Sequence, residues 1–412
     1  MGALRRINQD DLRNHNLSVT LETLLRAQEP MSRADLAKAT GLTKATMSLL
    51  VSKLLDRGVI EEGAPSISTS FGRPSTPLVV RGGRFCGIGL QINTDGYGCV
   101  ALDLNGDTLG KEWVSADMTG TDPYEIFAKL DAMTFPLESR LKHRGCTVAG
   151  AGLALPGLVT EDMRLMVARN LGWENVDLTR FNVVRRLDVV AGNEAKMAAL
   201  AQIPGYATER ANFLNVVNRT DSFIYLSTDI GIGGAVIRDG EVVAGEQGFA
   251  GEIGHMSVAL DGPVCSCGRH GCLECFAGRR ALIEAAGIAR DEEATGTEAL
   301  ERFLKGWRSG DPAIAAVVDR AIDALVSAIA SAINLCDIDK VLLGGLWMYF
   351  GDELASVLGG RLRSEVLGAP DREIHVFVPP VAQHPSLYGA AETGLRRFID
   401  DPLRYMDDSA EA

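Results

Sequence analysis

Apolar residues near the N-terminus recur at helical spacing in three consecutive stretches. Four leucines between residues 17 and 25 form one apolar stripe, and Pro30 follows as a stop signal. Ser32 then provides an N-cap for a second helix, which closes at Gly41, where a left-handed turn suits glycine. A third helix begins after Thr43, its cap. We therefore predict three helices, with a turn between the second and the third.

The third predicted helix has two distinct faces. Its apolar face is formed by Met47, Leu50, Val51, Leu54 and Leu55. The opposite face carries a lysine and small hydroxyl side chains, which allow a helix to lie close to a phosphate backbone and reach base edges in the major groove. This pattern predicts a recognition helix. The residues that we expect to contact DNA from it are Thr43, Lys44, Thr46 and Ser48.

Two short strand-like runs follow the helices. "VIEEG" and "STPLVV" flank "APSISTSFGRP", which is typical of a hairpin wing. Arg73 stands where this wing returns to its strand, and we expect it to enter the minor groove of DNA. An ordinary three-helix packing domain is the alternative, but the order of helices, turn and wing favours a winged helix-turn-helix DNA-binding domain over residues 1–82.

After residue 82 the pattern changes to apolar runs that end in glycines. These runs include "FCGIGLQIN", "VAGAGLALPG", "FIYLSTDIGIGG" and "VLLGGL", and helical stretches such as residues 311–334 separate them. Strands that alternate with helices in this way predict an α/β protein, here built of two lobes.

Charge and composition limit the possible partners and compartments. Residues 1–82 carry 11 lysines and arginines against 8 aspartates and glutamates, within a chain whose formal net charge is −13. Only this segment is suited to a polyanion. The most apolar helix has an uncharged stretch only over residues 324–336, too short for the ~20 residues of a membrane span. With no signal peptide evident, we expect a cytoplasmic protein without a membrane partner, whose clustered cysteines are better metal ligands than disulfide partners.

A cluster of soft ligands lies in the second half of the chain. Residues 254–275, "GHMSVALDGPVCSCGRHGCLEC", hold four of the eight cysteines and two histidines. The segment "AGEIGHMSV", residues 250–258, which overlaps its start, and the segment "CSCGRHGCLE" within it resemble the signature of the ROK family (repressors, open reading frames and kinases). The resemblance to the repressor branch extends over nearly the whole chain. It implies a two-lobed actin-like, ribonuclease-H-like sugar kinase fold behind the winged helix. The lobes would comprise residues 83–194 with about 385–412, and residues 195–384 with a zinc site.

The resemblance implies that four side chains of this cluster bind zinc: His255, Cys265, Cys267 and Cys272. Three thiolates and one imidazole form a familiar tetrahedral zinc set, and four protein ligands leave no open position for water, so we expect a structural zinc. His270 and Cys275 are interpreted as bystanders. The alternative is a group of free thiols in a reducing compartment.

The same resemblance places sugar contacts in three segments. Glutamates before and after the cysteines, an asparagine in "ARNLGW" and the pair in "AGNEAKMAAL" match the residues that bind sugar hydroxyls in ROK kinases. Carboxylates and amides suit hydroxyl recognition because they accept or fork hydrogen bonds. The alternative is that each is an ordinary surface polar residue. The expected sugar contacts are Asn170, Asn193, Glu194, Glu252, His255 and Glu274.

The segments that resemble the kinase machinery are altered. Family kinases carry an Asp-x-Gly-Gly-Thr phosphate loop, where this chain has "QINTD", residues 91–95, and so loses one carboxylate and both glycines while gaining another carboxylate. Glu194 stands at the position of the catalytic aspartate, and Ile230 replaces a threonine of the second phosphate motif. Phosphoryl transfer depends on positioning and on neutralising phosphate charge, so we expect neither ATP binding nor catalysis. Lys196 replaces a customary asparagine, and either a pair with Glu194 or contact with a phosphorylated ligand remains open.

These patterns together predict a sugar-responsive transcriptional regulator, and favour a repressor. It would bind operator DNA as a homodimer, or as a homotetramer, because two winged helices related by twofold symmetry can read two half-sites. The effector would be a sugar or a sugar phosphate. Two alternatives remain, namely an ATP-dependent sugar kinase with a fused DNA-binding domain, and a regulator controlled by a protein partner.

Overall fold

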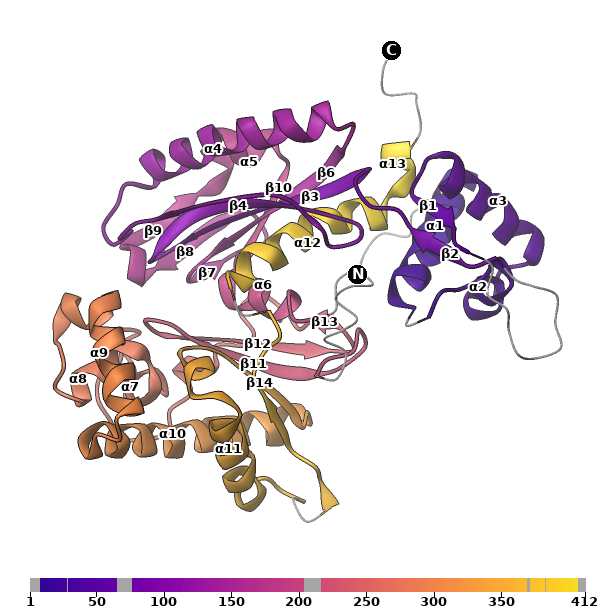
Figure 1. Cartoon of the computed structure of the whole chain (residues 1–412). Coiled ribbons are helices and arrows are strands. Elements are labelled where there is room, and N and C mark those ends of the chain that lie inside the picture. The colour runs from indigo at the N-terminus through magenta and orange to yellow at the C-terminus, as the bar shows by residue number, and fades with distance from the viewer. Residues whose placement is uncertain are drawn as a thin grey trace.

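The computed structural model describes residues 8–27, 29–64, 76–203, 216–368, 371–381 and 383–406. A small helical head lies beside two larger lobes, and each lobe is built on its own five-stranded sheet (Figure 1). The mixed α/β architecture predicted from the sequence is therefore confirmed. No helix within the described ranges is both long and apolar enough to cross a membrane.

The head contains the three predicted helices and a short hairpin. Ser32 and Thr43 cap the second and third helices by accepting bonds from backbone amides three residues on, and Gly41 has a φ of 72°. The hairpin strands pair antiparallel. Arg73, however, lies outside the described residues. The elements are α1 (Gln9–Arg26), α2 (Arg33–Thr40), α3 (Lys44–Asp56), β1 (Ile60–Glu62) and β2 (Leu78–Val80).

Helix α1 begins well before the apolar stripe that predicted it. Its first two turns are almost entirely polar, so no hydrophobic period marks them. A capping box starts the helix instead, in which Asn8 accepts from the amide of Asp11 and the Asp11 carboxylate accepts from the amide of Asn8. Apolar periodicity alone could not reveal this start.

The first lobe is a mixed sheet with the order β10-β6-β3-β4-β5. Strand β6 pairs parallel with both β10 and β3. Strand β10 ends in this half of the sheet with the polar residue Asn193. Helices α4 and α5 lie over one face, and a small three-stranded sheet extends the lobe (Figure 1). The elements are β3 (Phe85–Asn93), β4 (Gly96–Asp103), β5 (Thr108–Ser115), α4 (Pro123–His143), β6 (Thr147–Leu155), β7 (Leu158–Val159), β8 (Arg164–Ala168), β9 (Trp173–Asp177), α5 (Asn182–Arg186) and β10 (Val189–Asn193).

The second lobe repeats this plan with the order β13-β12-β11-β14-β15. Helix α10 supplies much of its core and is buried along most of its length. The elements are β11 (Phe223–Thr228), β12 (Ile232–Arg238), β13 (Glu241–Val242), α7 (Glu274–Ala277), α8 (Arg279–Ala285), α9 (Thr297–Arg308), α10 (Pro312–Cys336), β14 (Lys340–Gly345), α11 (Gly351–Glu365) and β15 (His375–Phe377).

Helix α12 (Pro385–Asp400) returns to the first lobe and lies directly on its sheet (Figure 1). A Cβ on Gly89 of β3 would lie 2.1 Å from the carbonyl oxygen of Leu387, and one on Gly152 of β6 would lie 2.2 Å from that of Ala390. Only glycine allows so close a contact between helix and sheet. Helix α6 (Glu194–Leu200) packs against both α12 and β12, and so joins the two lobes.

The head is docked on the far end of α12. Phe398 stacks on Phe85 at 4.1 Å between ring centroids, within a hydrophobic core that includes the leucines of α1. Glu22 of α1 accepts hydrogen bonds from Arg396 at 3.0 and 3.1 Å. Arg26 also reaches Glu241 of the second lobe at 3.3 Å. The head therefore touches both lobes. The division of the chain at residues 82, 194 and about 385 stays a prediction.

Candidate functional site

A cleft of about 960 Å³ opens between the two lobes. The first lobe contributes the end of β10 and the turn after β3, and the second contributes the β11–β12 turn and the residues that flank the cysteines. All six residues expected to contact sugar line this cleft, although up to 104 positions separate them in sequence: Asn170, Asn193, Glu194, Glu252, His255 and Glu274.

Glu274 is fixed by backbone and side-chain donors at the start of α7. The amide of Ile232 donates to its Oε2 at 3.0 Å, and the Ser266 hydroxyl donates to its Oε1 at 3.5 Å. A Cβ on Gly231 would lie 2.2 Å from the same carboxylate. Gly231 belongs to the second phosphate motif of the family kinases. Its close contact with the Glu274 carboxylate gives a reason for glycine at this position that does not depend on phosphate binding.

The two asparagines of the cleft differ in how far their amides are engaged. Asn193 caps α6 by accepting from the amides of Ala195 at 2.8 Å and Lys196 at 3.4 Å, and it donates to the carbonyl of Gly157 at 2.9 Å. These hydrogen bonds fix the start of α6 and therefore the position of Glu194, the next residue. Asn170 lies exposed on a 3-10 turn.

The cleft strongly changes the pKa of Glu194. Desolvation of this partly buried carboxyl raises the pKa of Glu194 to about 8, and the negative charges of Asp229 and Asp95 add to the rise, while a hydrogen bond from Gln91 opposes it. At neutral pH the carboxyl is mostly protonated. It can then donate a hydrogen bond as well as accept one.

An ion cluster across the cleft carried no signal in the sequence. Arg279 of α8, only 5% exposed, lies 3.2 Å from Asp229 in its own lobe and 3.6 Å from Asp95 in the first lobe. It also donates to the carbonyl of Thr295 at 2.7 Å. These partners are distant in sequence, so no local motif could have found them.

The ammonium group of Lys196 is turned to backbone carbonyls rather than to Glu194, and contact with a phosphorylated ligand stays an untested alternative. Its ammonium group donates to the backbone carbonyls of Gly248 and Ala244, the latter at 3.5 Å. It is not among the residues that line the cleft. Lys196 therefore ties α6 to the loop after β13.

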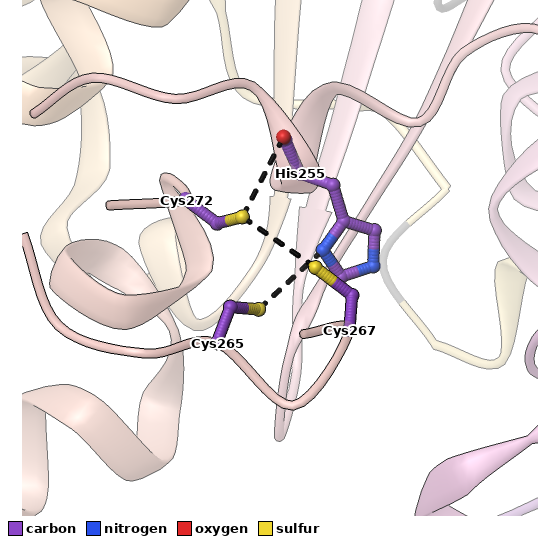
Figure 2. Close-up of side chains that lie close together, drawn as sticks. All are labelled: His255, Cys265, Cys267 and Cys272. Carbon is purple, nitrogen blue, oxygen red and sulfur yellow. Dashed lines mark hydrogen bonds between the residues drawn. The ribbon is translucent and has the colours of Figure 1, made fainter. Parts of the chain in front are cut away.

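The structure also brings the four predicted metal ligands together (Figure 2). Their ligand atoms all lie within 4.8 Å of one another, with 3.7 Å between the sulfurs of Cys267 and Cys272 and 3.7 Å between Cys265 Sγ and His255 Nδ1. Tetrahedral zinc–sulfur bonds of ~2.3 Å place neighbouring sulfurs ~3.8 Å apart. The donor set and its spacing therefore fit zinc.

Tight turns give the metal cluster its shape. Gly268 and Gly271 both have positive φ, 88° and 66°, and a Cβ on Gly271 would lie 1.6 Å from the carbonyl oxygen of Ala259. The cluster also adjoins the cleft, because Cys265 Sγ lies 3.9 Å from Glu274 Oε1. His270 and Cys275 do not belong to the group of four.

Helix α3 presents the predicted DNA-facing residues to solvent. Lys44 and Ser48 are exposed, whereas Met47 and Leu54 are fully buried. Thr46 is partly buried. The backbone amide of Thr46 donates to the Thr43 hydroxyl at 3.2 Å, so Thr43 caps the start of the helix. Leu49, 74% exposed, stands on the same outward side and offers no hydrogen bond.

Family comparisons account for both parts of this architecture. A model described as the ROK family matches residues 88–395, and one described as an IclR helix-turn-helix domain matches residues 20–63. The xylose repressor of Caldicellulosiruptor bescii is 28% identical over 377 residues, which are 84% of this chain and 86% of that protein. N-acetylmannosamine kinase of Vibrio cholerae is 32% identical over 169 residues, 41% of this chain and 55% of that protein.

Solved structures share the fold over different lengths. A ROK family transcriptional regulator, described as a homologue of the E. coli MLC protein, covers 96% of this chain and 98% of its own, with a TM-score of 0.74 and 22% identity. A ROK family glucokinase from Streptomyces griseus, in complex with glucose and AMPPNP, covers 75% of this chain and 98% of its own, with a TM-score of 0.59 and 22% identity. At these identities the likeness concerns the fold alone.

Proposed function

The chain belongs to the ROK family and is a sugar-responsive transcriptional repressor, and we propose that its inter-lobe cleft binds the sugar while α3 binds the operator. The observation that carries this proposal is the convergence on one cleft of the six side chains that the sequence predicts to contact sugar. Carboxylates, amides and an imidazole at one site suit a ligand with many hydroxyl groups.

Helix α12 supports a physical link between sugar and DNA. Pro385 and Ser386 at its first turn line the cleft, whereas Leu395 and Phe398 near its last turn belong to the hydrophobic core shared with the head. A sugar changes operator affinity only if it binds the DNA-competent and incompetent states differently. We propose that the angle between the lobes distinguishes these states and that α12 transmits it to the head.

We propose a structural role for zinc at His255, Cys265, Cys267 and Cys272. The four protein donors would fill its tetrahedral coordination, so that zinc would act by holding the loop beside Glu274 rather than by activating water. Sugar phosphorylation is not part of the proposal. Asp95 adds negative charge at the cleft, and phosphoryl transfer instead needs phosphate charge to be neutralised.

The first prediction tests the whole assignment. The protein should bind duplexes selected from a random DNA pool, and one sugar from a panel that includes D-xylose, D-glucose and N-acetyl-D-mannosamine should weaken this binding by about 10-fold or more. Fluorescence anisotropy measures both quantities in one titration. If no sugar releases the protein from DNA, control by a protein partner is favoured. If the protein hydrolyses ATP while phosphorylating a sugar, the alternative of a sugar kinase with a fused DNA-binding domain is favoured.

We also propose a homodimer or homotetramer that reads a pseudo-palindromic operator. One winged helix makes few contacts, and a second copy related by twofold symmetry doubles them at a fixed spacing. Light scattering on the free protein and on its complex with a selected duplex determines the assembly. A monomer that binds DNA tightly would contradict the proposal.

A second prediction concerns the exposed face of α3. Lys44→Ala should weaken operator binding by about 1–3 kcal/mol if the ammonium contacts a base, and should leave the thermal midpoint unchanged because the side chain is exposed. Lys305→Ala, which removes an exposed lysine from α9, is the matched control. Equal affinities of the two variants would remove Lys44 from the DNA interface.

A further inference from the structure

An unpartnered acceptor faces the cleft from β3. Gln91 is 3% exposed, and its Oε1 has no hydrogen-bond partner among the described residues. The same side chain lines the cleft. A buried acceptor left without a donor is unfavourable by about 1–3 kcal/mol, so a ligand that brings a donor gains affinity here.

Two carboxylates near Gln91 are further acceptors and carry negative charge. Its amide is hydrogen-bonded to Glu194, and Asp95 and Asp229 are close enough to raise the pKa of that carboxyl. All four side chains line the same cleft. A sugar hydroxyl can donate to such a surface, whereas a phosphate dianion brings only acceptors and negative charge.

The buried cations that could offset a phosphate are already engaged, which leaves one exposed arginine at the rim. Arg279 is held between Asp229 at 3.2 Å and Asp95 at 3.6 Å, and the ammonium of Lys196 is turned to backbone carbonyls outside the cleft lining. Burial, with the charge of Lys111, lowers the pKa of His384, which is therefore neutral at pH 7. Arg169 is the remaining cation of the described lining, exposed to solvent beside Asn170.

We propose that the effector is an unphosphorylated sugar, one hydroxyl of which donates a hydrogen bond to Gln91 Oε1, and that the Asp95–Arg279–Asp229 cluster excludes phosphorylated sugars. The inference rests on the proposed sugar-sensing function and narrows its ligand class. Gln91 then determines specificity, because its unpaired acceptor favours a ligand with a hydroxyl donor at this point. Asp95 repels the phosphate group of a phosphorylated sugar.

Calorimetric titration of the full-length protein tests the ligand class. The probes are D-xylose, D-glucose and N-acetyl-D-mannosamine, each with its terminal phosphate ester, and inorganic phosphate. The sugar that binds should do so at least about 100-fold more tightly than its phosphate ester, because like charges across a cleft repel strongly. Tighter binding of the ester would overturn the proposal. If no probe in either form binds or releases DNA, the proposed function itself fails.

Two variants test the residues named. Gln91→Leu keeps the buried volume but removes the acceptor, and should weaken binding of the free sugar by about 10-fold. Asp95→Asn should narrow the preference for the free sugar over its phosphate ester by about 10-fold, measured as the ratio of the two affinities. Glu373→Gln, at a side chain 91% exposed and outside the cleft lining, is the control for the charge change.

Each variant has an outcome that would contradict its role. Unchanged sugar affinity in the Gln91→Leu variant would contradict the proposed hydrogen bond between a sugar hydroxyl and Gln91 Oε1. If the Asp95→Asn variant keeps the full preference for the free sugar over its ester, the charge of Asp95 does not exclude phosphorylated sugars. Because Asp95 is about half exposed, this variant is informative even if the buried Gln91→Leu replacement lowers the thermal midpoint.

Discussion

Cys272→Ser should cost the protein its zinc, lower its thermal midpoint by about 10 °C and abolish the sugar response. The midpoint change corresponds to roughly 3–5 kcal/mol of unfolding free energy. Cys272 is fully buried, and its sulfur lies 3.7 Å from that of Cys267, so serine can replace neither the bond to zinc nor the packing of the sulfur. Zinc content by elemental analysis and the midpoint by calorimetry measure the two losses.

The loss of the sugar response has a separate cause in the contacts of Glu274. Its carboxylate accepts from Ser266, which lies between Cys265 and Cys267, and Cys265 Sγ is 3.9 Å away. A loop released from zinc would no longer hold Ser266 in place. The operator affinity with and without sugar, measured on the same preparation, reports this effect.

Cys275→Ser is the matched control for this prediction. Cys275 follows Cys272 by three residues on α7 and is partly exposed, but it lies outside the group of four ligand atoms. Its replacement should leave the zinc content and the sugar response intact. Loss of zinc from Cys275→Ser, or a full sugar response in Cys272→Ser without zinc, would contradict the assignment.

The sequence predicted those parts of the fold that local chemistry determines. The caps at Ser32 and Thr43 and the glycine turn at Gly41 each depend on one residue and its near neighbours, and all three lie where expected. The apolar runs that end in glycines were equally visible, since β6 and β14 are buried over most of their length and read as continuous apolar runs.

Contacts between distant segments could not be predicted in the same way. The ion pair between Arg279 and Asp95 joins two lobes, and the partners of Lys196 are backbone carbonyls that any sequence could supply. The close docking of α12 depends on Gly89 and Gly152 of two different strands. In each case the tertiary fold, and not the local sequence, determines which groups meet.

The candidate site shows the same division. The resemblance to ROK proteins named six expected sugar contacts and four expected metal ligands. The structure places the first group on one cleft and the ligand atoms of the second within 4.8 Å of one another. The resemblance did not reveal that Asn193 also caps α6, nor that Gln91 carries an unpaired acceptor. Those properties depend on the hydrogen bonds that neighbours make.

The raised pKa of Glu194 leads to a last prediction, on stability and pH. The carboxyl has a pKa of about 8 in the folded protein against an ordinary value of 4.5, because it is desolvated and faces Asp229 and Asp95. The folded state therefore binds more protons than the unfolded state between these two values. Stability contributed at Glu194 falls as the pH rises from about 4.5 to about 8.

Glu194→Gln removes this dependence because the amide does not titrate. The variant should be more stable than the parent by about 3 kcal/mol at pH 8.5, less than the full pKa difference implies because the cleft admits water, and the gain should shrink at pH 6. Denaturant unfolding at both pH values measures it. Glu174→Gln, at an exposed position on β9, should show no such trend. A gain of equal size at both pH values would mean that Glu194 is ionised throughout, so that a protonated carboxyl could not take part in binding the sugar.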